Sequence, residues 1–306
     1  MAQTRGAFQQ LYDNTDRRMF VMLGKHLKEL PDIWKKYTKV IQSDRQTEIS
    51  MNVVGFGDVP ERPEGQPFAT DVLMPGHQKT VTHTGWGLAY ECTIEAMEDD
   101  RYDQIRKYAM WLAFTAGYTI EKRAANILNN GFTTELTADG VSLFNTAHPL
   151  VRGGTARNRP SSDVDFSWTA LRDAVIDLET ETKHDSGQLA SSIENVVIVV
   201  PPHLEMTVDR AINSNGIPDQ QDNGRNSLKN RRDFTIVVNK LLTDTDAWYL
   251  LAGNKDMHGV KAYERVPITQ MEPETDPRTK NRLYPLRFRY SFFADTWQNS
   301  WGTSGA

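Results

Sequence analysis

A run of proline and glycine between two strand-like segments is the feature that most restricts the fold of this 306-residue chain. Residues 48–54 and 80–86 alternate apolar and polar side chains, as strands do. The stretch between them is rich in turn residues: Gly55, Gly57, Pro60, Pro63, Gly65, Pro67, Pro75 and Gly76. So many turn residues do not build a packed core, and loops of this length are usually functional or disordered. The pattern predicts that residues 44–95 form an extended two-stranded arm that projects from its domain.

An arm of this kind needs a second surface to cover it. Two strands alone are only marginally stable in water. The simplest candidate for that surface is a neighbouring copy of the same chain, so the sequence favours a protein that assembles with itself.

A long amphipathic helix is predicted over residues 99–130. Its apolar side chains recur at helical spacing, acidic residues stand at its start, and Asn129-Asn130-Gly131 forms a stop signal. At 1.5 Å per residue the helix would be about 45 Å long. A helix of that length crosses a mixed domain as a spine.

The other expected elements complete an α+β fold. Helices are predicted at 6–30, 168–182 and 204–212, and strands at 195–200, 234–238, 248–252 and 287–294. The segment 195–200, NVVIVV, is continuously apolar, which is typical of a strand buried on both faces.

The composition excludes several classes of protein. The net charge is −5 and the basic residues are scattered, so specific DNA binding is not expected. No apolar run approaches the roughly 20 residues needed to span a bilayer, and the N-terminus lacks the regions of a signal peptide. The single cysteine, Cys92, leaves no internal disulfide. We therefore expect a cytoplasmic protein without membrane contact.

No motif points to catalysis, a cofactor or a metal. A phosphate-binding loop, a dinucleotide fingerprint, a nucleophile elbow and a zinc-protease motif are all missing from the sequence. His77 and His83 would share one face of a strand, but no carboxylate or thiol is spaced to join them. His148 is expected to bond backbone groups in a turn. A soluble hydrolase that uses His148 with Asp139 or Asp163 stays open as an alternative to a non-enzymatic protein.

The order of these elements resembles the Hong Kong 97-type fold of tailed-phage major capsid proteins. The shared order is helical arm, extended loop, long helix, small mixed domain and returning strand. Residues 121–132, EKRAANILNNGF, and 138–149, ADGVSLFNTAHP, also resemble the Mu-like major head subunit (gpT) family. The resemblance in the order of elements covers nearly the whole chain, whereas the local sequence similarity covers about residues 121–160.

The resemblance implies a division of the chain into named parts. These parts are an N-terminal arm at 1–43, an extended E-loop at 44–95, a peripheral (P) domain at 96–199 with its spine helix at 99–130, an axial (A) domain at 200–281, and a P-domain strand that returns at 282–306.

It also implies a function and a set of partners. The chain would assemble into pentamers and hexamers of an icosahedral shell that encloses phage double-stranded DNA, touching that DNA without specificity. Implied partners are a separate scaffolding protein, which Met1 favours over a cleaved scaffolding domain, a portal protein and a decoration protein. Assembly would take place in the bacterial cytoplasm. Some relatives cross-link through an E-loop lysine, but we predict no cross-link for Lys79, the only lysine in 44–95.

Within that implied assembly we single out eight residues. Four apolar side chains of the E-loop are expected to anchor on a neighbouring subunit: Phe68, Val72, Leu73 and Met74. Two pairs of glycines are expected to act as hinges at its base, because glycine accepts unusual backbone angles: Gly55 with Gly57, and Gly85 with Gly87. The nearest alternative is an encapsulin-like nanocompartment shell that encloses cargo enzymes, and a tail or adaptor protein is a third reading.

Overall fold

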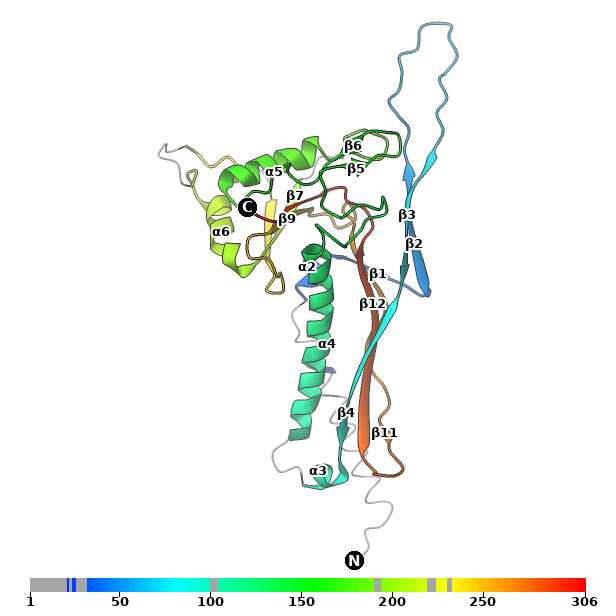
Figure 1. Ribbon diagram of the computed structural model, residues 1–306, viewed down its shortest axis with the longest axis vertical. Coiled ribbons are helices and arrows are strands. Elements are labelled where there is room, and N and C mark those ends of the chain that lie inside the picture. The colour runs from blue at the N-terminus through cyan, green and yellow to red at the C-terminus, as the bar shows by residue number, and fades with distance from the viewer. Residues whose placement is uncertain are drawn as a thin grey trace, which may run out of the picture.

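The computed structural model describes residues 21, 24–25, 32–99, 104–189, 194–218, 224–229 and 233–306. The helix predicted over 6–30 lies outside the described residues, apart from three positions within it. The described part forms an elongated body from which a hairpin projects at one end (Figure 1). None of its helices is long and apolar enough to cross a membrane.

The described elements belong to two larger sheets, two small ones and the helices around them. The helices are α2 (Trp34–Tyr37), α3 (Ile94–Glu98), α4 (Gln104–Asn129), α5 (Trp168–Thr180) and α6 (Glu205–Asn213), with a 3-10 turn at Pro202–Leu204. The long sheet contains β1 (Lys39–Gln42), β4 (Thr84–Cys92), β10 (Val260–Gln270), β11 (Glu274–Thr275) and β12 (Arg282–Ala294). The four-stranded sheet, in the order β13-β9-β7-β8, contains β7 (Asn195–Val200), β8 (Asp233–Val238), β9 (Trp248–Ala252) and β13 (Ser300–Thr303). The small sheets are the hairpin of β2 (Thr47–Val54) with β3 (Met74–Thr82), and the pair β5 (His148–Pro149) with β6 (Thr155–Ala156).

Strand β12 is the centre of the long sheet. Strands β10 and β4 pair along its two edges, both antiparallel. Its side chains alternate, and Leu286, Phe288 and Tyr290 are buried in the core that also takes the apolar stripe of α4. With 26 residues α4 is about 39 Å long, and it runs beside β4 and β12 (Figure 1). Sheet and helix together form one stiff block.

The predicted long helix is confirmed as α4, but its predicted start was wrong. Residues 94–98 form the separate helix α3, whose N-terminus is capped by the Thr93 hydroxyl, and Asp99 ends that helix. Asp99 therefore closes one helix instead of opening the next. Tyr108 is half exposed, whereas the rest of the described stripe is buried: Ala109, Leu112, Ala116, Ile120, Ala124 and Ile127.

The four-stranded sheet is buried on both faces. The even-numbered residues of β7 pack with α5 and α6, whereas Val197 and Val199 join the core that contains α4. Because both faces are covered, the strand is apolar throughout. The predictions for residues 195–200, 234–238 and 248–252 are confirmed as β7, β8 and β9, and that for 168–182 as α5.

The strands of the region 200–281 are divided between the two sheets. β8 and β9 belong to the four-stranded sheet, whereas β10 and β11 extend the long one. Strand β10 was not predicted, because Glu264, Arg265 and Pro267 interrupt its alternation and its register with β12 shifts twice. The strand predicted at 287–294 is confirmed, and β12 begins earlier, at Arg282.

One carboxylate holds α2 against α4. Glu121 of α4 accepts hydrogen bonds from the backbone amides of Ile33 at 2.8 Å and Trp34 at 3.1 Å. Amides at the start of a helix have no partner within it, so Glu121 supplies the missing acceptor. Burial raises the pKa of Glu121 from 4.5 to about 7, although the two amides act in the opposite direction.

We expect Glu121→Gln to flatten the pH dependence of unfolding. Because the pKa of Glu121 is higher in the folded chain, its contribution to stability is fully present below about pH 4.5 and is lost as the pH rises through about 7. Glutamine keeps an acceptor oxygen but does not ionise. Urea unfolding of unassembled subunits across this range measures the effect, with Glu205→Gln on the exposed side of α6 as control. Equal pH slopes for wild type and Glu121→Gln would contradict this assignment.

Candidate assembly interface

The hairpin of β2 and β3 has two chemically different faces. The strands pair antiparallel from Thr47 with Thr82 to Val54 with Met74. Since side chains alternate along a strand, Ile49, Met51 and Val53 share one face of β2. Each of the three is more than half exposed, whereas Val54, on the other face, is 2% exposed.

The inward face is tied to the body by polar contacts. The Ser50 hydroxyl donates to Asp295 Oδ2 at 2.7 Å. Lys79 Nζ reaches the Glu135 carboxylate at 3.0 Å and the backbone carbonyls of Leu136 and Ala294 at 2.5 and 2.8 Å. These three acceptors match the three donors of an ammonium group. Lys79 is thus engaged within its own chain, as an anchor of the hairpin.

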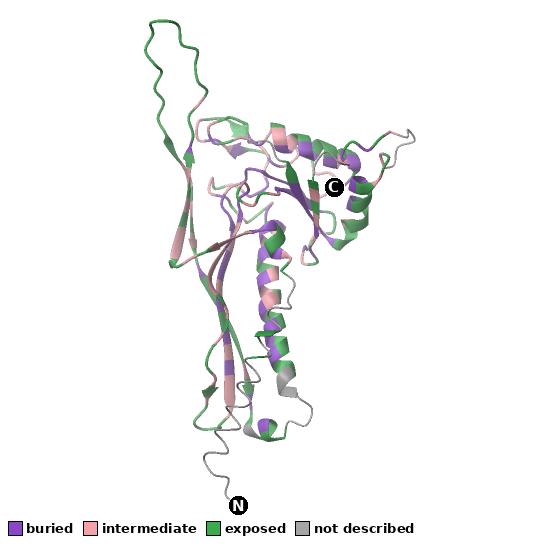
Figure 2. Ribbon diagram, turned by 180° about the vertical axis from the view of Figure 1, so that it is seen from behind, coloured by how far each residue is buried: buried purple, intermediate pink, exposed green. Residues whose placement is uncertain are grey.

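The tip of the hairpin, residues 55–73, has no regular secondary structure apart from a turn at Glu64-Gly65. All four predicted anchor residues lie in or beside it and are exposed: Phe68 by 78%, Val72 by 73%, Leu73 by 53% and Met74 by 43%. Figure 2 shows the tip exposed along its whole length and clear of the body. Monomeric proteins rarely expose so much connected apolar surface, so the tip has the character of an unfilled interface.

Arg152 fixes the root of the tip. Its Nη2 donates to Asp71 Oδ2 at 2.8 Å and to the Gly55 carbonyl at 3.1 Å. The amide of Gly57 also donates to Asp71, at 2.8 Å. This backbone bond and then Arg152 lower the pKa of the Asp71 carboxyl. The two sides of the loop are thereby held together where they leave the strands.

The four predicted hinge glycines lie in different settings, and none has a positive φ. A side chain at Gly55 would meet nothing within 4 Å, and Gly57 lies at the root of the tip. Gly85 and Gly87 lie inside β4, opposite Arg289 and Arg287 of β12, so they belong to the long sheet and not to the hairpin. Their role as hinges stays a prediction.

Another glycine was missed by the sequence analysis. A Cβ at Gly76 would lie 2.5 Å from the Asn52 carbonyl oxygen, because the two strands cross closely where their register shifts. The neighbouring Pro75-Gly76 pair was the available signal.

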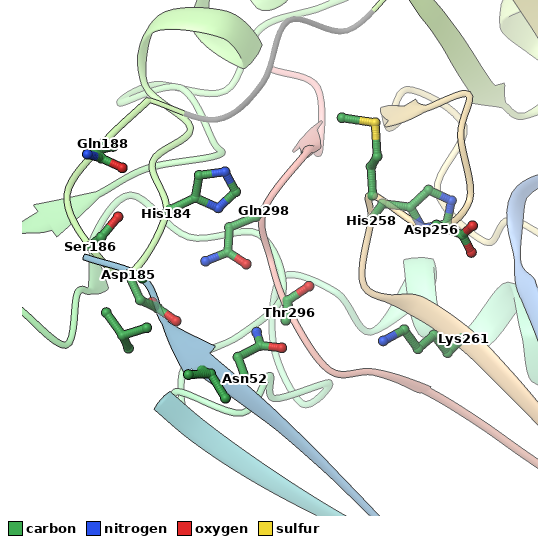
Figure 3. Close-up of a pocket in the computed structure, with 14 residues that line it drawn as sticks. Asn52, His184, Asp185, Ser186, Gln188, Asp256, His258, Lys261, Thr296 and Gln298 are labelled. Carbon is green, nitrogen blue, oxygen red and sulfur yellow. The ribbon is translucent and has the colours of Figure 1, made fainter. Parts of the chain in front are cut away.

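A polar cavity of about 420 Å³ lies between the body and the end of β2 that enters the tip. Figure 3 shows Asn52, Asp185, His258 and Gln298 among the residues that surround it. Burial raises the pKa of Asp185 and lowers that of His258 to about 4. Asp185 Oδ1 and His258 Nε2 have no hydrogen-bond partner among the described residues, and a polar cavity of this size is a place for water. Where it enters the tip, β2 therefore faces a polar cavity and not a packed core.

The histidines considered for chemistry have structural roles. His148 is fully buried, and its Nδ1 lies 2.7 Å from Asp139 Oδ2 while its Nε2 lies 3.1 Å from Asn158 Oδ1. The expectation that it bonds backbone was wrong, because long-range folding brings these two side chains to it. With both nitrogens occupied and the ring stacked on Trp297, His148 cannot reach a substrate. Asp163 pairs with Arg159 instead.

The pair His77 and His83 forms no metal centre with the residues around it. His83 lies between the hydroxyls of Ser43 and Ser291, at 2.9 and 3.0 Å. In the part of the chain that the structure describes, no group of three or more His, Cys, Asp or Glu could hold a metal ion.

Comparison with known families decides the class of protein. A model of the phage capsid protein family matches residues 78–298, which is more than half of the chain. The chain belongs to the phage capsid protein family. Capsid proteins are structural proteins of the virion shell, and a shell subunit is expected to expose an apolar element such as this hairpin.

Solved capsids have similar folds. The procapsid of bacteriophage JBD30 matches with a TM-score of 0.52 and 16% identity, over 99% of this chain and 77% of that chain. The capsid of the cyanophage P-SCSP1u matches with a TM-score of 0.60 and 11% identity, over 89% of this chain and 88% of that chain. A virus-like particle from Pyrococcus furiosus matches with a TM-score of 0.52 and 11% identity, over 94% of this chain and 98% of that chain. No curated protein sequence matches the chain. The predicted mixed α and β capsid fold is confirmed.

We expect Lys79→Ala to loosen the hairpin without unfolding the body. The substitution removes charge-assisted hydrogen bonds and leaves Glu135 without its cation, so local opening of β2 and β3 should become about tenfold more frequent. Hydrogen exchange of the β2 and β3 amides measures this opening. Lys122→Ala, on the exposed side of α4, is the control. Unchanged exchange in the hairpin would show that Lys79 does not anchor it.

Proposed function

We propose that this chain is the major capsid protein of a tailed bacteriophage. It would form the pentamers and hexamers of an icosahedral shell that encloses double-stranded DNA. The single observation that carries the proposal is the hairpin tip, whose apolar side chains are exposed in a chain of the phage capsid protein family. Such a tip gains its burial only from another molecule.

The division of labour between hairpin and body supports a shell subunit. The body is a stiff block of one long helix and two sheets, and a rigid body of this kind suits a subunit of a ring. In rings of five or six, one face of a subunit meets a different face of the next, and the rotation closes the ring. The hairpin adds contact area between neighbours, and many modest contacts make a stable shell through multivalency.

The named parts of the capsid fold can be proposed with revised limits. We assign the E-loop to β2, β3 and the tip, and the P domain to α4 with the long sheet. The A domain corresponds to the four-stranded sheet with α5 and α6. This assignment follows the two buried clusters and the sheet pairing, which put β10 and β11 with the long sheet and β7 with the other.

We propose a relationship to the Mu-like major head subunit family from the sequence around the end of α4. The two similar segments, residues 121–132 and 138–149, form the end of α4 and the turn in which Asp139 holds His148. Proposed partners are a separate scaffolding protein, a portal protein and a decoration protein. The net charge of −5 disfavours tight binding of phosphates, so any contact with packaged DNA would be weak and non-specific. Assembly would take place in the host cytoplasm.

The likeness to a virus-like particle from Pyrococcus furiosus favours a second candidate function. In that case the shell would be a nanocompartment that encloses cargo enzymes. The contents of purified particles, nucleic acid or protein, separate the two functions.

We expect serine at all four anchor positions, Phe68, Val72, Leu73 and Met74, to prevent shell formation. The change removes the apolar surface that a neighbour would bury, while the exposed positions leave the folded subunit intact. Sedimentation and electron microscopy measure assembly, and circular dichroism measures folding. Ile176→Ser, at an exposed apolar position of α5, is the control. Normal shells from the fourfold variant would refute the proposed role of the tip.

A further inference from the structure

The long sheet carries a basic strip on the face that points away from α4. On β12, Leu286, Phe288 and Tyr290 are buried toward α4, so the alternating residues Arg287 and Arg289 point to the opposite face. Arg287 is exposed and Arg289 is half-buried. On β10, Tyr263 contacts the ring of His83 on that outer face, and Arg265 follows it by two residues.

The neighbouring strand leaves room beside these arginines. Gly87 of β4 pairs with Arg287 and Gly85 with Arg289, and Ala89 follows on the same face. A Cβ built on Gly85 would lie 3.9 Å from Arg289 Cγ, which places both on one side of the sheet. Strand β4 therefore offers a strip of bare backbone beside a row of guanidinium groups. Its neighbours Trp86 and Tyr90 turn to the other face and pack against the core.

The positive charge of this strip is not compensated within the subunit. No ion pair joins Arg265, Arg287 or Arg289 to a carboxylate of the described residues. Arg265 Nη1 and Arg289 Nε are buried and have no hydrogen-bond partner there. Burial is the main cause that lowers the pKa of His83. Glu48 raises this pKa, and the positive charges of Arg265 and Arg289 lower it further. Arg289 Nη2 donates to the His83 carbonyl at 3.4 Å, and the exposed guanidinium of Arg287 is the group that this face offers to an incoming acceptor.

The hairpin tip carries the complementary charge. Between Gly55 and Leu73 the sequence contains four acidic residues, Asp58, Glu61, Glu64 and Asp71, against the single Arg62. Asp71 is held by Arg152 and Asp58 accepts from Gln188. Glu61 and Glu64 make no ion pair or hydrogen bond to a described residue. The tip thus combines free carboxylates with the exposed apolar anchors.

The tip cannot reach the strip of its own subunit. It leaves the upper end of β3, and the strand then runs away from it toward β4 (Figure 1). From Met74 to Gly85 the chain advances about 35 Å at the rise of a strand. A second copy is therefore the only form of this chain that can bring the two surfaces together.

We propose that the hairpin tip of one copy lies across the glycine strip of β4 on a second copy, where Glu61 and Glu64 pair with Arg287 and Arg289. This rests on the proposed function, because it names the surface that receives the tip. Gly85 and Gly87 then serve as the floor of the contact, since side chains at these positions would hold an incoming extended segment away from the arginines. Because the pairs lie near solvent, salt weakens them.

Charge reversal tests the contact from both sides. Arg287→Glu with Arg289→Glu, and separately Glu61→Arg with Glu64→Arg, should each lower the fraction of protein in shells about tenfold, because a weakened contact is repeated at every subunit. The chain that carries all four substitutions should regain assembly to within about twofold of wild type, because each copy then offers opposite charges again. Sedimentation velocity measures the shell fraction, and circular dichroism confirms folding. Arg172→Glu with Lys240→Glu reverses the same number of charges away from the strip and should assemble normally.

Two outcomes overturn the proposal. Either the arginine variant assembles like wild type, or the fourfold charge swap assembles no better than its parents. If the serine variant of the tip fails to assemble while the charge variants succeed, the capsid function stands and only the receiving surface is wrong. If neither set affects assembly, the tip has no role in it.

Discussion

The structure depends on a hairpin that can bury only one of its faces. Its inward face is held by Lys79 and Ser50 against the body, so the outward face and the tip are left without cover. A two-stranded hairpin gains little stability alone, and apolar side chains that stay in water contribute nothing to folding. The missing burial has to come from outside the subunit. The way this chain distributes its apolar residues thus favours self-assembly, as proposed above.

The body provides the rigidity that such a limb needs. Strand β7 is covered on both faces, and α4 packs against β4, β10 and β12 of the long sheet. Close-packed interiors deform little, so strain from assembly would fall on the less closely packed places. One of these is the polar cavity between Asn52 and Gln298, where β2 enters the tip. The glycines of β4 pair with β12 in the long sheet, and their role as hinges stays a prediction.

Periodicity predicts which segments form helices and strands, but not which of them meet. The stripe of α4, the apolar run of β7 and the Pro- and Gly-rich tip were all predictable, because each is a local pattern. The alternation of residues 80–86 predicted a strand, yet it could not show that the chain changes partner from β2 to β12 near His83. Strand β10 was missed because its bulges and Pro267 break the alternation. The contacts of His148 with Asp139 and Asn158 depend on the folded chain alone.

Two kinds of force with different tolerance would act together at the tip. Apolar burial has no preferred direction, so Phe68 and Leu73 can shift on a neighbour while they stay covered. Attraction between charges falls only slowly with distance. The interaction energy between Glu61 and Arg287 is therefore only partly lost when one of them is displaced. A contact made of these two terms keeps its strength over a range of angles between subunits. In the proposed shell, one chain would then serve in rings of five and of six, whereas a network of short, directional hydrogen bonds would favour a single geometry.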